Sequence, residues 1–156
     1  MKRLLFDVNV ILDVLLDRAP HADLASEVWG SVEDGRAVGL LSAHAVTTIH
    51  YLNAREVGPH RAHQTTDALL SVFDVATVDR QVLHSALALG WTDFEDAVTA
   101  AAAQRAKCDA LVTRSPSDFK GSPVRVLMPA EALPWLNPAR PDAASALQSR
   151  RRRSPR

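Results

Sequence analysis

The sequence predicts an α/β fold in which a mostly parallel central sheet of four to five strands carries helices on both faces. Three observations lead to this prediction. Short apolar runs alternate along the chain with longer segments of helical periodicity. Turn signals such as Asp34-Gly35 and Gly58-Pro59 separate these units. A length of 156 residues fits one domain with one buried core.

Five segments are predicted to be strands because they are short, apolar and bounded. The first carries Asp7 near its end, and the third alternates between apolar and polar residues. The fourth follows an alanine-rich segment, and the fifth lies close to the end of the periodic pattern. The predicted strands cover residues 3–8, 38–41, 73–78, 109–113 and 124–127.

Seven helices are predicted from apolar periodicity, caps and breakers. In the first, after residue 8, Val10, Ile11, Val14 and Leu15 should face inward, and Asp13 and Asp17 outward. In the second, residues 22–33, the inward positions are Leu24, Val28 and Val32. Ser42, Asp79 and either Thr92 or Asp93 are candidate N-caps of later helices. The remaining predicted helices cover residues 43–55, 60–71, 80–89, 94–106 and 129–135.

Bulk composition excludes several protein classes. The content of 47% hydrophobic and 23% charged residues is typical of a globular domain. No apolar run approaches the roughly 20 residues of a membrane span. Only three apolar residues follow Met1-Lys2-Arg3, so no signal peptide is expected. One cysteine, Cys108, excludes an internal disulfide and a cysteine-rich zinc site. We expect a cytoplasmic protein that does not associate with membranes.

Charge divides the chain into two parts. Residues 1–136, the predicted domain, carry 12 basic and 17 acidic residues, whereas residues 137–156 carry six arginines and one aspartate. The second part is rich in Pro, Ala and Ser and lacks apolar periodicity, so we predict a disordered basic tail. Its arginines could bind RNA phosphates or an acidic partner, or form a solvated terminus without a specific role.

Aspartates occur where a metal site could form. Asp7 lies at the carboxyl end of the first predicted strand, and Asp93 and Asp96 lie at the start of the helix that leads into the fourth strand. Sites in parallel sheets form beyond the carboxyl ends of the strands. Mg²⁺ and Mn²⁺ prefer oxygen ligands, so clustered carboxylates here indicate metal-dependent phosphoryl transfer. The alternative is that these acids only cap helices or favour the helix dipole.

Three segments in register resemble PIN-domain ribonucleases, and most closely their bacterial VapC-like toxin group. These are Leu5-Phe6-Asp7-Val8-Asn9, Asp93-Phe94-Glu95-Asp96-Ala97 and the stretch 110–119. The resemblance extends over about residues 3–135. It implies a three-layer α/β/α fold, Mg²⁺- or Mn²⁺-dependent RNA cleavage, a cognate antitoxin partner and a homodimer.

The resemblance also assigns roles to single residues. Asp7, Asp96 and Asp93 match metal-binding acids, and Asn9 matches the neighbour that orients the first acid. Two positions depart from the pattern. Thr48 stands where the family commonly has glutamate, and Ser115 stands where it has aspartate or asparagine. Both hydroxyls could hold a metal-bound water, but they supply no charge.

Several interpretations remain open at this point. Arg114 could contact substrate phosphate or form a salt bridge to a site acid. Asp118 is expected to be a turn or cap residue rather than a ligand. A catalytically weakened PIN-like module that binds RNA or protein is the main alternative to an active nuclease. A receiver-like or flavodoxin-like domain is the third, although the chain lacks a glycine-rich phosphate loop.

Overall fold

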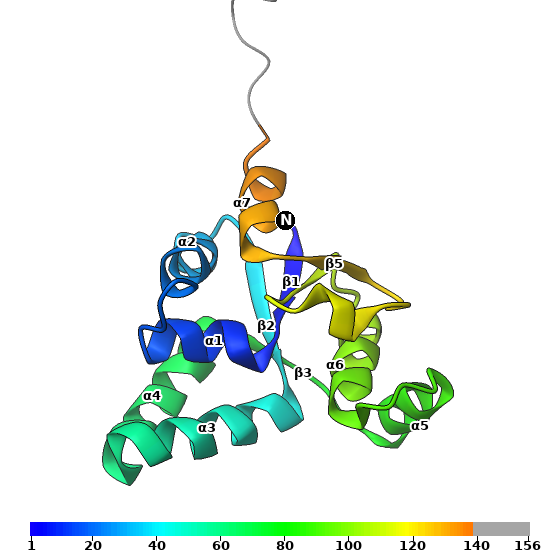
Figure 1. Ribbon diagram of the computed structural model, residues 1–156, viewed down its shortest axis with the longest axis horizontal. Coiled ribbons are helices and arrows are strands. Elements are labelled where there is room, and N and C mark those ends of the chain that lie inside the picture. Colours follow the sequence, from blue (N-terminus) through cyan, green and yellow to red (C-terminus); the bar gives the residue numbers. More distant parts are fainter. Residues whose placement is uncertain (139–156) are drawn as a thin grey trace, which may run out of the picture.

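A computed structural model describes residues 1–138 of the chain. Its five-stranded sheet has the order β3-β2-β1-β4-β5, and every neighbouring pair is parallel. This confirms the predicted α/β fold with a parallel central sheet (Figure 1). The predicted basic tail lies outside the described residues from residue 139 onward. The strands are β1 (Arg3–Phe6), β2 (Val38–Ser42), β3 (Asp74–Ala76), β4 (Ala110–Val112) and β5 (Arg125–Leu127).

The helices occupy the positions that periodicity predicts. The second predicted helix matches α2 at both ends, and the others differ by one to a few residues. They are α1 (Val8–Leu15), α2 (Ala22–Glu33), α3 (Ala43–Val57), α4 (Pro59–Val72), α5 (Arg80–Ala88), α6 (Phe94–Arg105) and α7 (Pro129–Leu136), with a short 3₁₀ turn, η1 (Pro116–Phe119), between β4 and β5.

Alternation along the buried strands creates one core on each face of the sheet. Leu4 and Phe6 of β1 point to one side, where α1, α2, α3, α4 and α7 contribute apolar residues. Leu5 points to the other side and packs with residues of α5 and α6. Successive side chains of a strand face opposite ways, so both faces of a central strand need cover. The result is the expected three-layer arrangement (Figure 1).

Two features explain how closely helices approach the sheet. Helix α6 is buried from Ala97 to Ala103, and its small alanine side chains allow tight packing. The ring of Phe73 lies close to the backbone of Gly39 in β2. A Cβ atom at position 39 would lie 2.6 Å from that ring and would clash with it. Phe73 in turn packs edge-on against Phe6 and Trp29. Small residues therefore leave space for aromatic rings in the core.

Periodicity assigned two side chains to the wrong environment. Asp13, predicted to face outward, is only 1% exposed, because α1 is buried at four successive positions and packs against both α2 and α3. Leu24, predicted to face inward, is 40% exposed. Among the capping predictions, Asp79 and Asp93 do cap α5 and α6 through their side chains. Ser42 occupies the N-cap position of α3, but its hydroxyl makes no capping bond.

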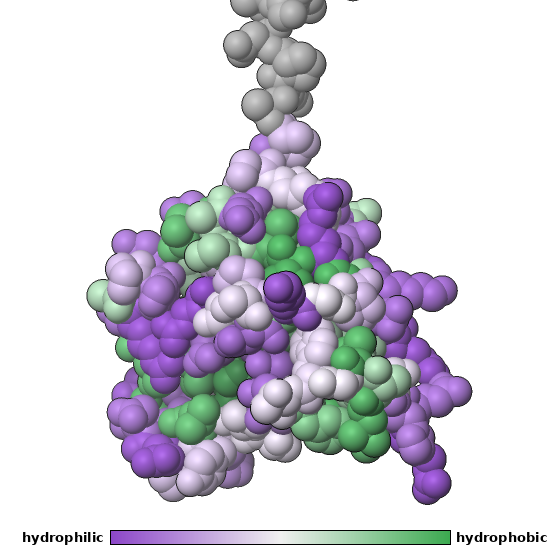
Figure 2. Space-filling model, turned by 45° about the vertical axis from the view of Figure 1, so that its right-hand side comes forward, coloured by the Kyte–Doolittle hydropathy of each residue, from purple (hydrophilic) through white to green (hydrophobic). Residues whose placement is uncertain are grey.

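The visible face of the molecule is mainly hydrophilic, with apolar residues in separate small groups (Figure 2). Tyr51 on α3 and Leu87 on α5 are among the exposed apolar side chains. No helix within residues 1–138 has the length and apolar character that crossing a bilayer requires.

Candidate functional site

Asp7 directly follows β1 and is held in place by α1 and by the segment at the end of β4. Its backbone N–H donates to the Val112 carbonyl, 2.9 Å away. One carboxylate oxygen accepts from the Val8 N–H at 2.8 Å, and the other accepts from the Thr113 hydroxyl at 2.9 Å. The residue is 9% exposed. Asp7 therefore caps α1, as the alternative to a metal site predicted. It is also a fixed carboxylate at the carboxyl edge of the sheet.

The environment of Asp7 disfavours its charge. Burial raises the pKa of Asp7 above its ordinary value, and the charges of Glu95 and Asp118 push it in the same direction. The hydrogen bonds from Thr113 and Val8 oppose this rise. Thr113, which has no role among the predicted site residues, follows β4 and is completely buried. The sequence signal for a role of Thr113 is its position at the end of the predicted strand 109–113, directly before Arg114.

Asp96 lies in the first turn of α6, in the field of several other acids. Partial burial, followed by the charges of Asp93, Asp7, Asp118 and Glu95, raises the pKa of Asp96 to about 7. Asp93 caps the same helix by accepting from the Asp96 N–H at 3.1 Å. The charge of Asp7 is among these causes, so the carboxylates after β1 and at the start of α6 lie near enough to interact electrostatically.

Asp118 belongs to this acidic group, although the sequence favoured a turn or cap role. It is exposed within η1, and its charge raises the pKa of both Asp7 and Asp96. It also lines a hollow of about 420 Å³ together with Asp93 and Asp96. Asp118 follows Ser115 by three residues, so it provides a nearby carboxylate where Ser115 does not. We add Asp118 to the candidate site residues.

The donors in this group match the chemistry of a hard divalent cation. All are carboxylates, which Mg²⁺ and Mn²⁺ prefer, and their mutual repulsion would be relieved by a cation. Within residues 1–138, however, no three His, Cys, Asp or Glu side chains lie close enough together to form a metal site. The donor type therefore fits a divalent ion, while the full set of ligands is not assembled around one point.

The remaining predicted site residues do not contact these acids by hydrogen bonds. The Thr48 hydroxyl donates to the His44 carbonyl at 3.4 Å, within α3. The Ser115 N–H donates to the Thr113 hydroxyl at 3.1 Å. Asn9 is half-buried in the first turn of α1. In the part of the chain that is described, no hydrogen bond joins any of these three side chains to Asp7, Asp93 or Asp96.

Arg114 forms a salt bridge, but its partner is not one of the site acids. One guanidinium nitrogen lies 3.3 Å from an oxygen of the buried Asp13. Arg18 approaches the same oxygen at 3.8 Å. The alternative in which Arg114 forms a salt bridge to a site acid is therefore wrong, because its partner is Asp13. Its role in substrate binding remains a prediction.

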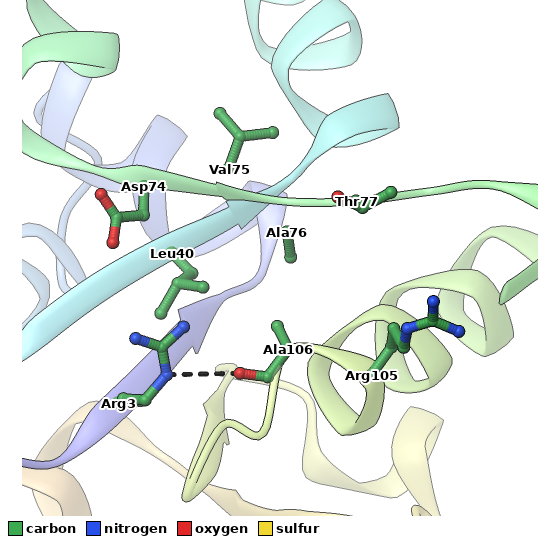
Figure 3. A pocket seen from close by; sticks show the side chains of 8 residues that line it. All are labelled: Arg3, Leu40, Asp74, Val75, Ala76, Thr77, Arg105 and Ala106. Atoms are coloured by element: carbon green, nitrogen blue, oxygen red, sulfur yellow. Dashed lines mark hydrogen bonds between the residues drawn. The ribbon is translucent and has the colours of Figure 1, made fainter.

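A second hollow, of about 430 Å³, lies away from the acids (Figure 3). It is lined by Arg3 at the start of β1, by β3 residues including Asp74, and by Arg105 and Ala106 at the end of α6. The Arg3 side chain donates to the Ala106 carbonyl there at 3.3 Å. This hollow contains one acid, so it does not compete with the Asp7 region as a cation site.

The raised pKa of Asp96 gives a prediction about stability. A carboxyl whose pKa is 3.8 when unfolded and about 7 when folded binds its proton more tightly in the folded state. Its stabilising contribution is present below pH 4 and is lost as pH rises to 7. Asp96→Asn should therefore melt above the wild type at pH 8 and near it at pH 4.5. After allowance for solvent screening we expect about 1–2 kcal/mol, or roughly 2–8 °C.

Calorimetry at the two pH values checks this result. Asp74→Asn, which removes an exposed acid of β3, is the matched control and should show no such pH-dependent gain. A difference between Asp96→Asn and wild type that stays the same at both pH values would contradict the prediction.

Comparison with known proteins supports the family assignment. A family model described as the PIN domain matches residues 3–115. No curated protein sequence matches the chain. Solved structures share its fold at low identity, among them the following three. The first is VapBC2 from Rickettsia felis bound to a promoter DNA fragment, at 13% identity and a TM-score of 0.65, covering 81% of this chain and 98% of that one.

The second is a toxin–antitoxin complex from Klebsiella pneumoniae, at 22% identity and a TM-score of 0.63, covering 81% of this chain and 97% of that one. The third is Mycobacterium tuberculosis VapC20, described as a sarcin-ricin loop cleaving toxin. It is 19% identical with a TM-score of 0.57, covering 69% of this chain and 86% of that one. The family model covers most of the chain and includes Asp7, Asp93 and Asp96, so this protein belongs to the PIN-domain family.

Proposed function

We propose that this protein is a metal-dependent endoribonuclease and the toxin component of a toxin–antitoxin pair. The observation that carries the proposal is a buried carboxylate, Asp7, which Val8 and Thr113 hold at the carboxyl edge of a parallel sheet. Three further acids, Asp93, Asp96 and Asp118, line one hollow, and the charge of Asp7 contributes to the raised pKa of Asp96. Carboxylates that lie near one another repel each other when no cation is bound. A bound divalent cation relieves that repulsion and can catalyse phosphodiester hydrolysis. The solved structures with the same fold include toxins and toxin–antitoxin complexes, which supports the same role here.

Each acid would make a different contribution to the site. Asp7 is held by Val8 and Thr113, so it would offer a carboxylate of fixed orientation to Mg²⁺ or Mn²⁺. Asp96 would hold the cation from α6, with Asp93 and Asp118 at the exposed side. The bound ion would neutralise phosphate charge and activate a water for hydrolysis. Thr48 and Ser115 would place no charge in the site, which lowers the expected metal affinity.

The test is cleavage of single-stranded RNA by the purified full chain. We expect no cleavage after treatment with EDTA and recovery with Mn²⁺ or Mg²⁺ at millimolar concentration. Thermal melting of the same samples should show stabilisation by Mn²⁺, because an ion that binds only the folded state raises its stability. A folded preparation that leaves RNA intact with either ion would reject the nuclease assignment.

The weakened binding module stays as a second candidate because of specific observations. No three potential ligands converge within the described residues, and Thr48 and Ser115 replace acids. This candidate predicts RNA binding without cleavage and a melting temperature that Mn²⁺ leaves unchanged. The two candidates therefore differ in both readouts of one experiment.

The proposed partners can be tested independently of catalysis. A cognate antitoxin would be encoded by an adjoining reading frame and should co-purify with this chain when both are expressed. The proposed homodimer would have twice the chain mass of 17.0 kDa in light scattering. We also propose a cytoplasmic location, where an RNA substrate and an antitoxin would both be available.

A further inference from the structure

The hollow beside Asp96 has an aromatic wall as well as an acidic one. Its lining comes from two segments, residues 90–96 before and within α6, and residues 117–120 around the end of η1. The structure packs α6 against η1, so these segments form one depression of about 420 Å³. That volume lies within the range of pockets that hold small organic ligands. The catalytic group proposed above uses only its acids.

Trp91 forms the aromatic part of this wall and is held from behind. Its ring packs edge-on against Phe119, with centroids 6.0 Å apart and planes at 78°. Phe119 is itself 2% exposed and belongs to the same apolar core cluster as residues of α6 and β4. Gly90 has a φ of +68°, a conformation that glycine adopts readily, and it turns the chain into Trp91. The indole is therefore a half-buried, supported surface rather than a mobile exposed ring.

Polar groups of two kinds complete the lining. Lys120 is exposed and provides a positive charge next to the acids. Thr92, Ser117 and Asp118 provide hydroxyl and carboxylate oxygens. An unpaired nucleotide has features that match both kinds, because its base can stack on an aromatic ring and its phosphate pairs with a cation. The 2′-hydroxyl and amino groups of the nucleotide can donate hydrogen bonds to these oxygens.

We propose that this hollow binds one unpaired ribonucleotide adjacent to the phosphodiester that the acids would cleave. Its base lies against Trp91 and its phosphate lies at Lys120. The proposal rests on the nuclease function proposed above for the location of the scissile bond. Trp91 and Lys120 are binding residues in it, and the reacting atoms belong to the neighbouring acidic group.

The experiment measures binding rather than cleavage. The full chain carrying Asp7→Asn, to block cleavage, is titrated with a labelled five-nucleotide RNA in Mn²⁺. A series of the same RNA carries one abasic residue at each position. With Trp91 present, one abasic position should weaken binding about 10-fold, the size of one lost stacking contact. In Trp91→Ala all RNAs should bind equally weakly, and Trp91→Phe should restore part of the difference.

Lys120→Ala is tested by the salt dependence of the same binding. Loss of one phosphate contact should reduce the slope of log affinity against log salt by about 0.7 for a single strand. Lys120→Arg should restore the slope, and Lys2→Ala is the control because Lys2 packs on Trp135, far from this hollow in the fold. Melting curves establish that every variant is folded.

The outcomes separate this inference from the nuclease proposal. An abasic effect of equal size with and without Trp91, or a Lys120→Ala slope equal to that of the control, would overturn the nucleotide site. If wild-type protein leaves RNA uncut, the nuclease proposal fails, and the same titration with wild type still decides whether the hollow binds a nucleotide.

Discussion

Replacing Asp7 with asparagine should lower the rate of RNA cleavage by about 10³-fold or more. The amide keeps the size of the side chain and one carbonyl oxygen, so it can still accept from Val8 or Thr113. It removes the negative charge that would hold the cation. Loss of one preorganised electrostatic contact typically costs 10²–10³-fold, and loss of the ion itself costs more.

The fold should survive this substitution, which makes the result interpretable. Burial raises the pKa of Asp7, so ionising it costs stability at neutral pH, and removing the charge removes that cost. Asp7→Asn should therefore melt at or above the wild-type temperature at pH 7.5. Single-turnover cleavage of labelled RNA with Mn²⁺ measures the activity, and Asp74→Asn serves as the control. Cleavage within tenfold of wild type would show that Asp7 is a structural cap only.

Arg114→Leu should destabilise the protein by about 2–4 kcal/mol, or roughly 5–15 °C in melting temperature. The buried Asp13 depends on charge from two arginines, because one of its oxygens has no hydrogen-bond partner. Arg114 is the nearer, at 3.3 Å, and Arg18 is 3.8 Å away. Removal of Arg114 leaves a carboxylate that is 1% exposed with only the more distant partner.

Two further variants isolate the cause. Arg18→Leu should cost less than about 1 kcal/mol, because that arginine is farther away and more exposed. Asp13→Leu combined with Arg114→Leu should recover much of the loss, since replacing both members of a buried pair by apolar residues is often neutral. Denaturation in urea measures all three. Equal effects of Arg18→Leu and Arg114→Leu would refute the assignment of Arg114 as the principal partner.

Arg114 is not excluded from binding substrate by this pair. A guanidinium has five N–H donors, and the contact to Asp13 involves one nitrogen. Cleavage of RNA by Arg114→Leu would therefore test the predicted substrate role separately from the stability measurement.

Most of the fold could be predicted because its determinants are local. The apolar runs at β1 and β2 and the bounds of α2 follow from short stretches of sequence. Asp79 and Asp93 act as caps as expected, because a cap bonds to a backbone N–H within three residues of itself. The parallel sheet followed from the alternation of strands and helices, which leaves few other arrangements.

Contacts between distant segments could not be predicted, because they depend on the tertiary structure. Periodicity placed Asp13 in solvent, but α1 is covered by α2 and α3 on sides that its own sequence does not reveal. The local sequence around Asp118 predicted only a turn or cap role. Its effect on the pKa of Asp7 and Asp96 depends on how η1 packs against α6. Thr113 binds Asp7 only because β1 and β4, 106 residues apart, are neighbours in the sheet.

The sequence alone thus determined the order of elements and the kinds of side chain at their ends. Folding determined which of those side chains meet, because electrostatic and hydrogen-bond interactions depend on separation in space and not along the chain. The Asp7 carboxylate illustrates both, since Val8 is its neighbour in sequence and Thr113 its neighbour only in the folded protein.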